Sequence, residues 1–246
     1  MLKNSLNVII IAIAIVISSY LFSNAFQNRN KSSDNISVTG SGKKDFVSDL
    51  IVWSGSFSKK SMTLKDAYSE IDSDREKIKS YLLSKGIAAN EMVFSAVNFN
   101  KDFETTYNEN GTLRQQLFTG FTLTQSVNIQ SKEVDKIEEI SRQSSELINS
   151  GVEFYSSPPE YYYTKLAELK IQMIAEATKD ASSRAKSIAE NANASLGNLK
   201  KSDMGVFQIT GQNSSEDFSY GGSFNTQSNN KTAHITVRLG FQVNLI

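Results

Sequence analysis

Hydrophobic and polar residues alternate most regularly near the C-terminal end of the chain. Over residues 232–245 every second position is apolar, and a period of two predicts a strand with one face on the core and one in water. Another strand is predicted over residues 199–210, so the chain ends in a β-hairpin. The residues predicted to face the core are Ala233, Ile235, Val237, Leu239, Phe241, Val243 and Leu245.

Apolar residues recur at three- and four-residue spacing in three other segments, which predicts amphipathic helices. The first helix is capped by Thr63 and ends at Lys85-Gly86, and its charged stretch 72–79 is predicted to be a solvated face. The second is capped by Ser131 and ends at Gly151.

The third predicted helix, over residues 163–196, is long. At about 1.5 Å per residue it would extend for roughly 50 Å, which is more than one small domain covers. Its apolar stripe narrows to alanines such as Ala181 and Ala185, which permit close approach of another element. That element is either another subunit or, in ordinary packing, the same one.

The remaining β-rich segments complete a recognisable order. Residues 36–40 and 46–57 predict one strand bulged at Gly40-Ser41-Gly42, residues 92–107 and 113–129 a hairpin turning at Asn110-Gly111, and residues 152–156 a strand. The fold class is therefore α+β. We expect an antiparallel sheet with the ferredoxin-like split β-α-β-β-α-β order, followed by a long α-helix and a C-terminal β-hairpin.

The N-terminal end carries an uncharged, largely apolar run from Leu6 to Phe22. Its length suits either a short membrane span or a long signal-peptide core, and Ser23-Asn24-Ala25 offers a cleavage site, so cleavage and retention both stay open. We expect a signal peptide or membrane anchor over 1–26, a polar linker over 27–35 and the folded domain over 36–246. Both alternatives predict an exported protein of the periplasm or cell envelope, with the N-terminal segment contacting the inner membrane.

Composition restricts the chemistry. The 246 residues include 26 Lys and Arg and 26 Asp and Glu, and no basic stripe with interleaved aromatic residues, so nucleic-acid binding is not expected. The chain has no cysteine and one histidine, which excludes disulfides, thiolate catalysis and a zinc site of the usual His/Cys type.

The remaining signals for a catalytic site are weak. The sole histidine, His234, is accompanied by no nucleophile-elbow motif, and residues 40–44 lack the spacing of a phosphate loop. We therefore predict no catalytic, cofactor-binding or metal-binding residues, and no cofactor.

The polar segment 211–231 exceeds the usual length of a hairpin loop. It contains three aromatic residues, Phe218, Tyr220 and Phe224. It is either a contact surface or a disordered tip.

Several short motifs resemble the SIMPL-domain family of bacterial periplasmic and outer-membrane immunogenic proteins. They are Val38-Thr39-Gly40-Ser41-Gly42, Gly120-Phe121, Gly151-Val152, and the helix motif with Ala181, Arg184, Ala185, Ile188, Ala189 and Leu196-Gly197. Ser48-Asp49 stands where the family usually has Pro-Asp. The resemblance covers residues 36–246 and implies an exported α+β domain with no established enzymatic activity. In some members it implies a large homo-oligomer, and in others a link to oxidative-stress tolerance.

Three hypotheses for function follow. The first is a self-assembling envelope protein with Ala181, Ala185 and the 211–231 loop at its subunit interfaces. The second is a monomeric module that binds a peptide, glycan or small molecule through Phe218, Tyr220 and Phe224. The third is an exported hydrolase whose carboxylates come together only in space.

Overall fold

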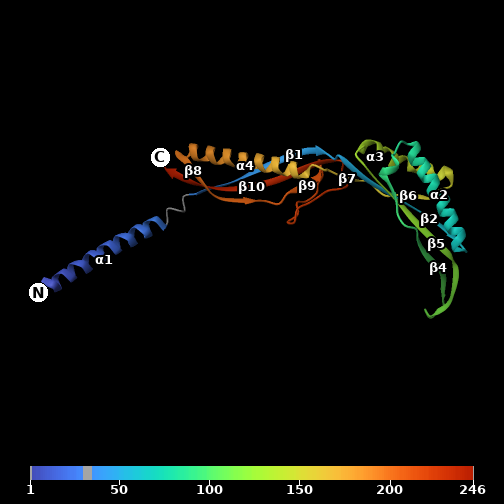
Figure 1. The fold of residues 1–246 in the computed structure, drawn as a ribbon, viewed down its shortest axis with the longest axis horizontal. Helices are drawn as coiled ribbons and strands as arrows, with labels where there is room; N and C mark the ends of the chain where they lie inside the picture. Colours follow the sequence, from blue (N-terminus) through green and yellow to red (C-terminus); the bar gives the residue numbers. More distant parts are fainter. Residues whose placement is uncertain (1, 30–34, 246) are drawn as a thin grey trace.

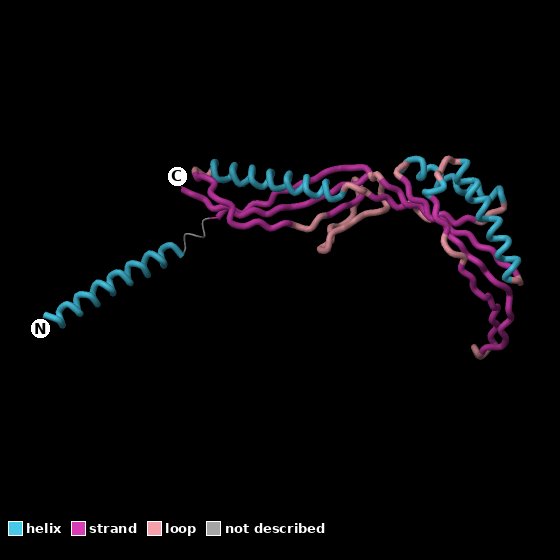
Figure 2. The backbone as a smooth tube through the Cα atoms, in the orientation of Figure 1, coloured by secondary structure: helices cyan, strands magenta, loops and turns pink. Residues whose placement is uncertain are grey.

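A computed structural model describes residues 2–29 and 35–245. The fold is α+β, as predicted, but it contains two antiparallel sheets, which lie end to end (Figures 1 and 2). The helices are α1 (Leu2–Arg29), α2 (Leu64–Ser84), α3 (Val134–Gln143) and α4 (Leu166–Asn191), with short 3₁₀ segments at Ala89–Glu91 and Ser144–Ser150. The strands are β1 (Asn35–Val47), β2 (Leu50–Ser61), β3 (Met92–Phe94), β4 (Asn98–Tyr107), β5 (Leu113–Ser131), β6 (Phe154–Ser156), β7 (Glu160–Tyr162), β8 (Ala194–Met204), β9 (Gln208–Gly211) and β10 (Asn230–Leu245).

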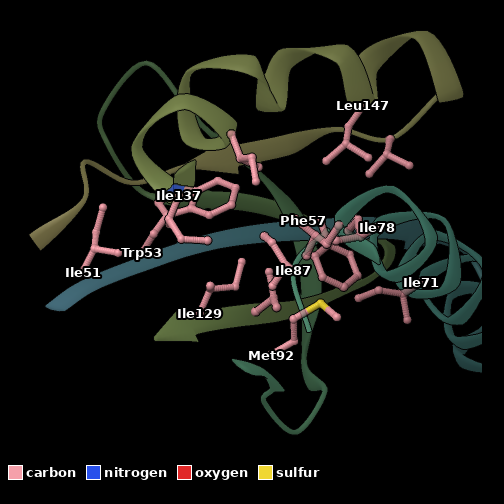
Figure 3. Close-up of a cluster of buried hydrophobic side chains, with 14 of the residues drawn as sticks. Ile51, Trp53, Phe57, Ile71, Ile78, Ile87, Met92, Ile129, Ile137 and Leu147 are labelled. Carbon is pink, nitrogen blue, oxygen red and sulfur yellow. The ribbon is translucent and has the colours of Figure 1, made fainter. Parts of the chain in front are cut away.

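The first half of the chain forms the predicted ferredoxin-like unit. Its strands lie in the order β3-β5-β2-β6. In addition, β4 pairs with the first part of β5, and β7 pairs with β2. Helices α2 and α3 cover one face, and the core between them and the sheet centres on Trp53 and Phe57 (Figure 3). The Trp53 indole Nε1–H donates to the Ser156 hydroxyl at 2.9 Å, so its one polar group is satisfied.

The second sheet combines the two ends of the folded region. Strand β10 lies between β1 and β8 and also pairs with β9, while α4 covers one face. The predicted alternation of β10 is confirmed through residue 241, since Ala233, Ile235, Val237, Leu239 and Phe241 are all buried. The C-terminal hairpin is therefore present, with β1 as an additional strand.

The single strand predicted over 36–57 was wrong in its continuity. The chain breaks at Ser48-Asp49, where β1 leaves one sheet and β2 enters the other. Asp49 stabilises this break by accepting from both the backbone N–H and the hydroxyl of Thr164. Gly40 and Gly42 do not form a bulge, because β1 pairs with β10 in unbroken register through them.

The third helix is shorter than predicted, and its alanines pack within the chain. Residues before 166 form β7 and a turn, and the helix ends before Asn193, which has a positive φ of 54°. Ala177, Ala181 and Ala185 are fully buried against the second sheet. Ordinary packing within one subunit is thus confirmed, and a subunit interface through Ala181 and Ala185 is excluded by their burial.

Helix α2 forms as predicted, and the Thr63 hydroxyl accepts from the Asp66 backbone N–H. The prediction that 72–79 is a solvated face was wrong at Asp74, which is only 2% exposed. Its carboxylate lies 3.0 Å from the Lys59 ammonium of β2 and 3.2 Å from that of Lys77. This ion-paired carboxylate joins the helix to the sheet.

The prediction of membrane contact through the N-terminal segment must be corrected. Across residues 2–29 and 35–245, no helix combines the length and the apolar character needed to cross a membrane. Part of the predicted 27–35 linker, residues 30–34, lies outside the described residues, and residues 27–29 belong to α1.

Candidate interaction surfaces

The β4–β5 hairpin projects beyond the rest of its sheet. Strand β2 stops pairing with β5 at Ser61, which lies opposite Phe121. Residues 101–120, which we call the arm, therefore continue as a two-stranded ribbon beyond the end of β2 and extend past the helices (Figure 1). The arm lacks the helices and the third strand that stabilise the rest of the sheet. Because a two-stranded hairpin is only marginally stable by itself in water, the arm gains stability from any surface that covers it.

One face of the arm is aromatic and uncovered. Cross-strand pairing places Phe103 opposite Phe118 and Tyr107 opposite Leu113 on this face. The Phe103 and Phe118 rings lie 5.7 Å apart, and Phe118 lies 5.1 Å from Phe121 at the base of the arm. Phe103, Tyr107 and Leu113 remain 47%, 64% and 61% exposed. The aromatic face thus continues the buried face of the sheet into water.

The arm also carries charges of both signs. Asp102 pairs with Lys60 at 3.0 Å, and the Thr122 hydroxyl and this contact lower the pKa of its carboxyl. Within the part of the chain that the structure describes, Lys101, Glu104, Glu109 and Arg114 form no ion pair. Two cations and two anions are therefore available beside the aromatic face.

A second surface lies where the 211–231 loop crosses the open face of the other sheet. A cavity of about 270 Å³ is lined by Phe218, Tyr220 and His234 together with residues of β9 and β10. The Phe218 ring centroid lies 5.4 Å from that of His234. Burial and the nearby Lys43 lower the pKa of His234, partly offset by Asp45, so this wall of the cavity is a neutral imidazole near pH 7.

A family-model comparison agrees with the fold described above. The model named SIMPL, described as a protein of unknown function (DUF541), matches residues 36–241. The chain belongs to the SIMPL family. The resemblance seen in the sequence is thereby confirmed for both sheets of the folded region. A comparison with curated proteins gives no match for the chain.

In this SIMPL chain the 211–231 loop is tied down along its length. The Gln208 side-chain carbonyl accepts from the backbone N–H groups of Ser219 and Ser223, while its amide donates to the Ser219 carbonyl. Further along, the Thr226 carbonyl accepts from the backbone N–H of Tyr161 at 2.7 Å. Since Tyr161 belongs to β7, the loop connects the two sheets and is an ordered part of the fold, not a disordered tip.

The SIMPL fold separates the three predicted loop aromatics. Phe218 and Tyr220 line the cavity with His234, but Phe224 lies elsewhere, with its ring 6.3 Å from that of Tyr162. Sequence reasoning placed His234 on the polar face of its strand, and that face is where the cavity forms. It did not bring His234 and Phe218 together, because their contact depends on the path of the loop.

Sequence reasoning also missed Lys231, whose side chain is buried at the base of the same loop. Its ammonium donates to the Asn225 carbonyl at 2.5 Å, and burial lowers its pKa to about 8 against the opposing effect of Glu216. In the sequence Lys231 stands where the predicted loop ends and the predicted strand begins. A lysine at such a position is expected to be exposed to solvent, because the sequence does not show that the loop folds over it.

Proposed function

We propose that this SIMPL protein works by self-assembly, without catalysis, and that copies contact one another through the aromatic face of the arm. The observation that carries the proposal is the exposed Phe103, which packs beside the half-buried Phe118 on a ribbon that no helix or third strand covers. Fully burying a side chain of this size contributes about 1.5–3 kcal/mol. An arm that exposes Phe103, Tyr107 and Leu113 therefore gains substantially from a partner surface.

The charges of the arm favour a second copy as that partner. Lys101 and Arg114 balance Glu104 and Glu109, so the arm is nearly neutral and does not repel itself. In a dimer with a twofold axis, each arm presents the same surface to the other. The cations of one arm can then pair with the anions of its partner. A partner of strongly one-sided charge would leave half of these groups unpaired.

The proposal includes a location outside the cytoplasm. It is supported by the apolar N-terminal run and the small residues Ser23 and Ala25 before Phe26, which suit signal-peptide cleavage. We propose export to the periplasm or cell envelope through cleavage of this segment.

Cross-linking between single cysteines tests the arm contact, because the natural chain has no thiol to interfere. Thr105 lies opposite Gln116 on the aromatic face, whereas its neighbour Thr106 points to the other face. With a short bismaleimide, Thr105→Cys is expected to give cross-linked dimers well ahead of the control Thr106→Cys. Equal yields from the two variants, or none from either, would count against an arm contact through this face.

A second candidate function is a monomeric binding module for a small molecule at the loop cavity. The contact of Phe218 with His234 favours it, since the two rings form one wall of a partly enclosed space. Tyr220 is fully exposed at the mouth of the cavity, where a ligand would meet it. Retention of a ligand that Phe218→Ala abolishes, in a protein of unchanged monomeric mass, would favour this function over self-assembly.

A further inference from the structure

The sheet face opposite α2 and α3 is uncharged at its centre and rich in hydroxyl and amide groups. Alternation places every second residue of β2 and β5 on it, in cross-strand pairs such as Ser54 with Asn128 and Ser56 with Ser126. The other members are Ser58, Thr122, Thr124 and Gln130. In the described structure, the side chains of Ser54, Ser56, Ser58 and Thr124 form no hydrogen bond within the chain.

A cleft of about 690 Å³ opens at one end of this face. Its floor includes Asn128 and Gln130 of β5, and Asn90 of the short 3₁₀ segment rises beside them. These three amides are exposed, and within the described residues they form no hydrogen bond with the rest of the chain. Each amide both donates and accepts, so the cleft offers paired donors and acceptors.

The charged groups around the cleft are mostly satisfied by the chain itself. Lys136 donates to the Gly86 carbonyl at 2.7 Å and to the Glu133 carboxylate at 2.6 Å. Glu91 accepts from the backbone N–H of Ala88 at 3.1 Å. With Lys132 at the rim, two cations and two anions line the cleft and cancel. Apart from Lys132 and the carboxylate of Glu91, the groups left to bind a ligand are therefore neutral.

An aromatic ring lies on the same face at the outer strand. Tyr155 of β6 pairs with Ser56 and is 63% exposed. Asn128 lies opposite Ser54, and Tyr155 lies opposite Ser56 on the other side of β2. Tyr155 is therefore two strands across and two residues along from Asn128, a separation of about 12 Å. A flat ring beside rows of hydroxyl groups can stack on the C–H face of a sugar while the amides bind its hydroxyls.

We propose that this cleft and the hydroxyl-rich face beside it bind an uncharged oligosaccharide of a few residues. A sugar hydroxyl both donates and accepts, which matches the three amides, and the balanced charge of the cleft gives no attraction for an anionic or cationic glycan. A peptide fits less well, because the apolar lining that would hold its side chains is limited to Leu50, Ala88 and Val93, and the edge strand β3 has only three residues to pair with it. This surface is separate from the arm contact.

Calorimetric titration of the full chain with tetrasaccharides of β-linked glucose and of β-linked N-acetylglucosamine tests the proposal. The wild-type protein is expected to bind at least one series. The double variant Asn128→Ala/Gln130→Ala should weaken binding at least tenfold, and Asn90→Ala provides a second variant outside the sheet. Asn100→Ala is the matched control, since it removes an exposed amide from the same face of the sheet at the far end, opposite Thr122.

Loss of affinity in both cleft variants with unchanged thermal unfolding, and none in Asn100→Ala, would support the site. Failure of the wild-type chain to bind either series at millimolar concentration would overturn it. Cleft-dependent binding of an extended peptide library, or of anionic polysaccharide alone, would also overturn it. Arm variants such as Phe103→Ser should leave sugar binding unchanged, so this test is independent of self-assembly.

Discussion

Gly40 of β1 lies directly against the backbone of Ala181 in α4. A Cβ atom on Gly40 would come within 2.3 Å of the Ala181 nitrogen and 2.2 Å of the Ala177 carbonyl oxygen. Beside it, the Ser41 backbone N–H donates to the Asp180 carboxylate at 2.9 Å. Arg184 and this hydrogen bond together lower the pKa of Asp180. The glycine and the alanines therefore position the long helix on its own sheet.

Replacing Gly40 with alanine is expected to destabilise the second sheet strongly. The new methyl group would meet rigid backbone atoms, so strand and helix must separate, at a cost of about 3 kcal/mol or more. Chemical unfolding followed by circular dichroism measures this loss. Gly221→Ala is the control, since a methyl group there would have no neighbour within 4 Å, and it should change the free energy of unfolding little. Equal stability of the two variants would contradict the contact.

Removing the Asp74 carboxylate is expected to destabilise the first sheet. Asp74→Ala leaves the Lys59 and Lys77 ammonium groups without their shared partner, and we expect a loss of about 2–3 kcal/mol because both lysines keep some contact with water. The matched control is Asp72→Ala, which breaks the exposed pair with Arg75 and should cost less than about 1 kcal/mol. Similar losses in the two variants, measured by urea unfolding, would show that Asp74 has no special role.

Lys231 is expected to make stability rise with pH in the alkaline range. Its pKa is about 8 in the folded chain and 10.5 ordinarily, so between these values the unfolded chain binds more protons than the folded one. The free energy of unfolding should therefore increase with pH in that window. In Lys231→Met this contribution is absent. Urea unfolding of both proteins from about pH 7.5 to about pH 9.5 should show a difference that grows with pH. A constant difference would contradict the burial of a neutral lysine.

Much of the fold could be predicted from local patterns. The cap at Thr63, the Asn110-Gly111 turn and the alternation of β10 are signals carried by neighbouring residues, and each formed as expected, the alternation through residue 241. The division into two sheets was missed, because it depends on β1 pairing with β10 at the other end of the chain. Nothing near Ser48 marks a strand that changes sheets.

The interaction surfaces were less predictable. The alanine stripe was considered as a subunit interface because small residues permit close approach, but it gives no sign of which partner approaches. The sequence predicted the arm as a hairpin but not the exposure of its aromatic residues. They are exposed because β2 ends at Ser61 and no longer pairs with β5 beyond it. The burial of Asp74 likewise depends on Lys59 arriving from another element.

The solution mass of the full chain tests self-assembly through the arm most directly. Light scattering coupled to size exclusion should give, for the wild-type protein, a multiple of the mass of one chain, which is 27.2 kDa before the N-terminal segment is cleaved. In Phe103→Ser the dissociation constant of the assembly should rise at least tenfold, because each contact loses an aromatic side chain. The control is Tyr68→Ser, an exposed aromatic residue of α2 outside the arm, which should keep the wild-type mass. A monomeric wild-type chain, or an assembly equally stable in Phe103→Ser, would contradict the central claim.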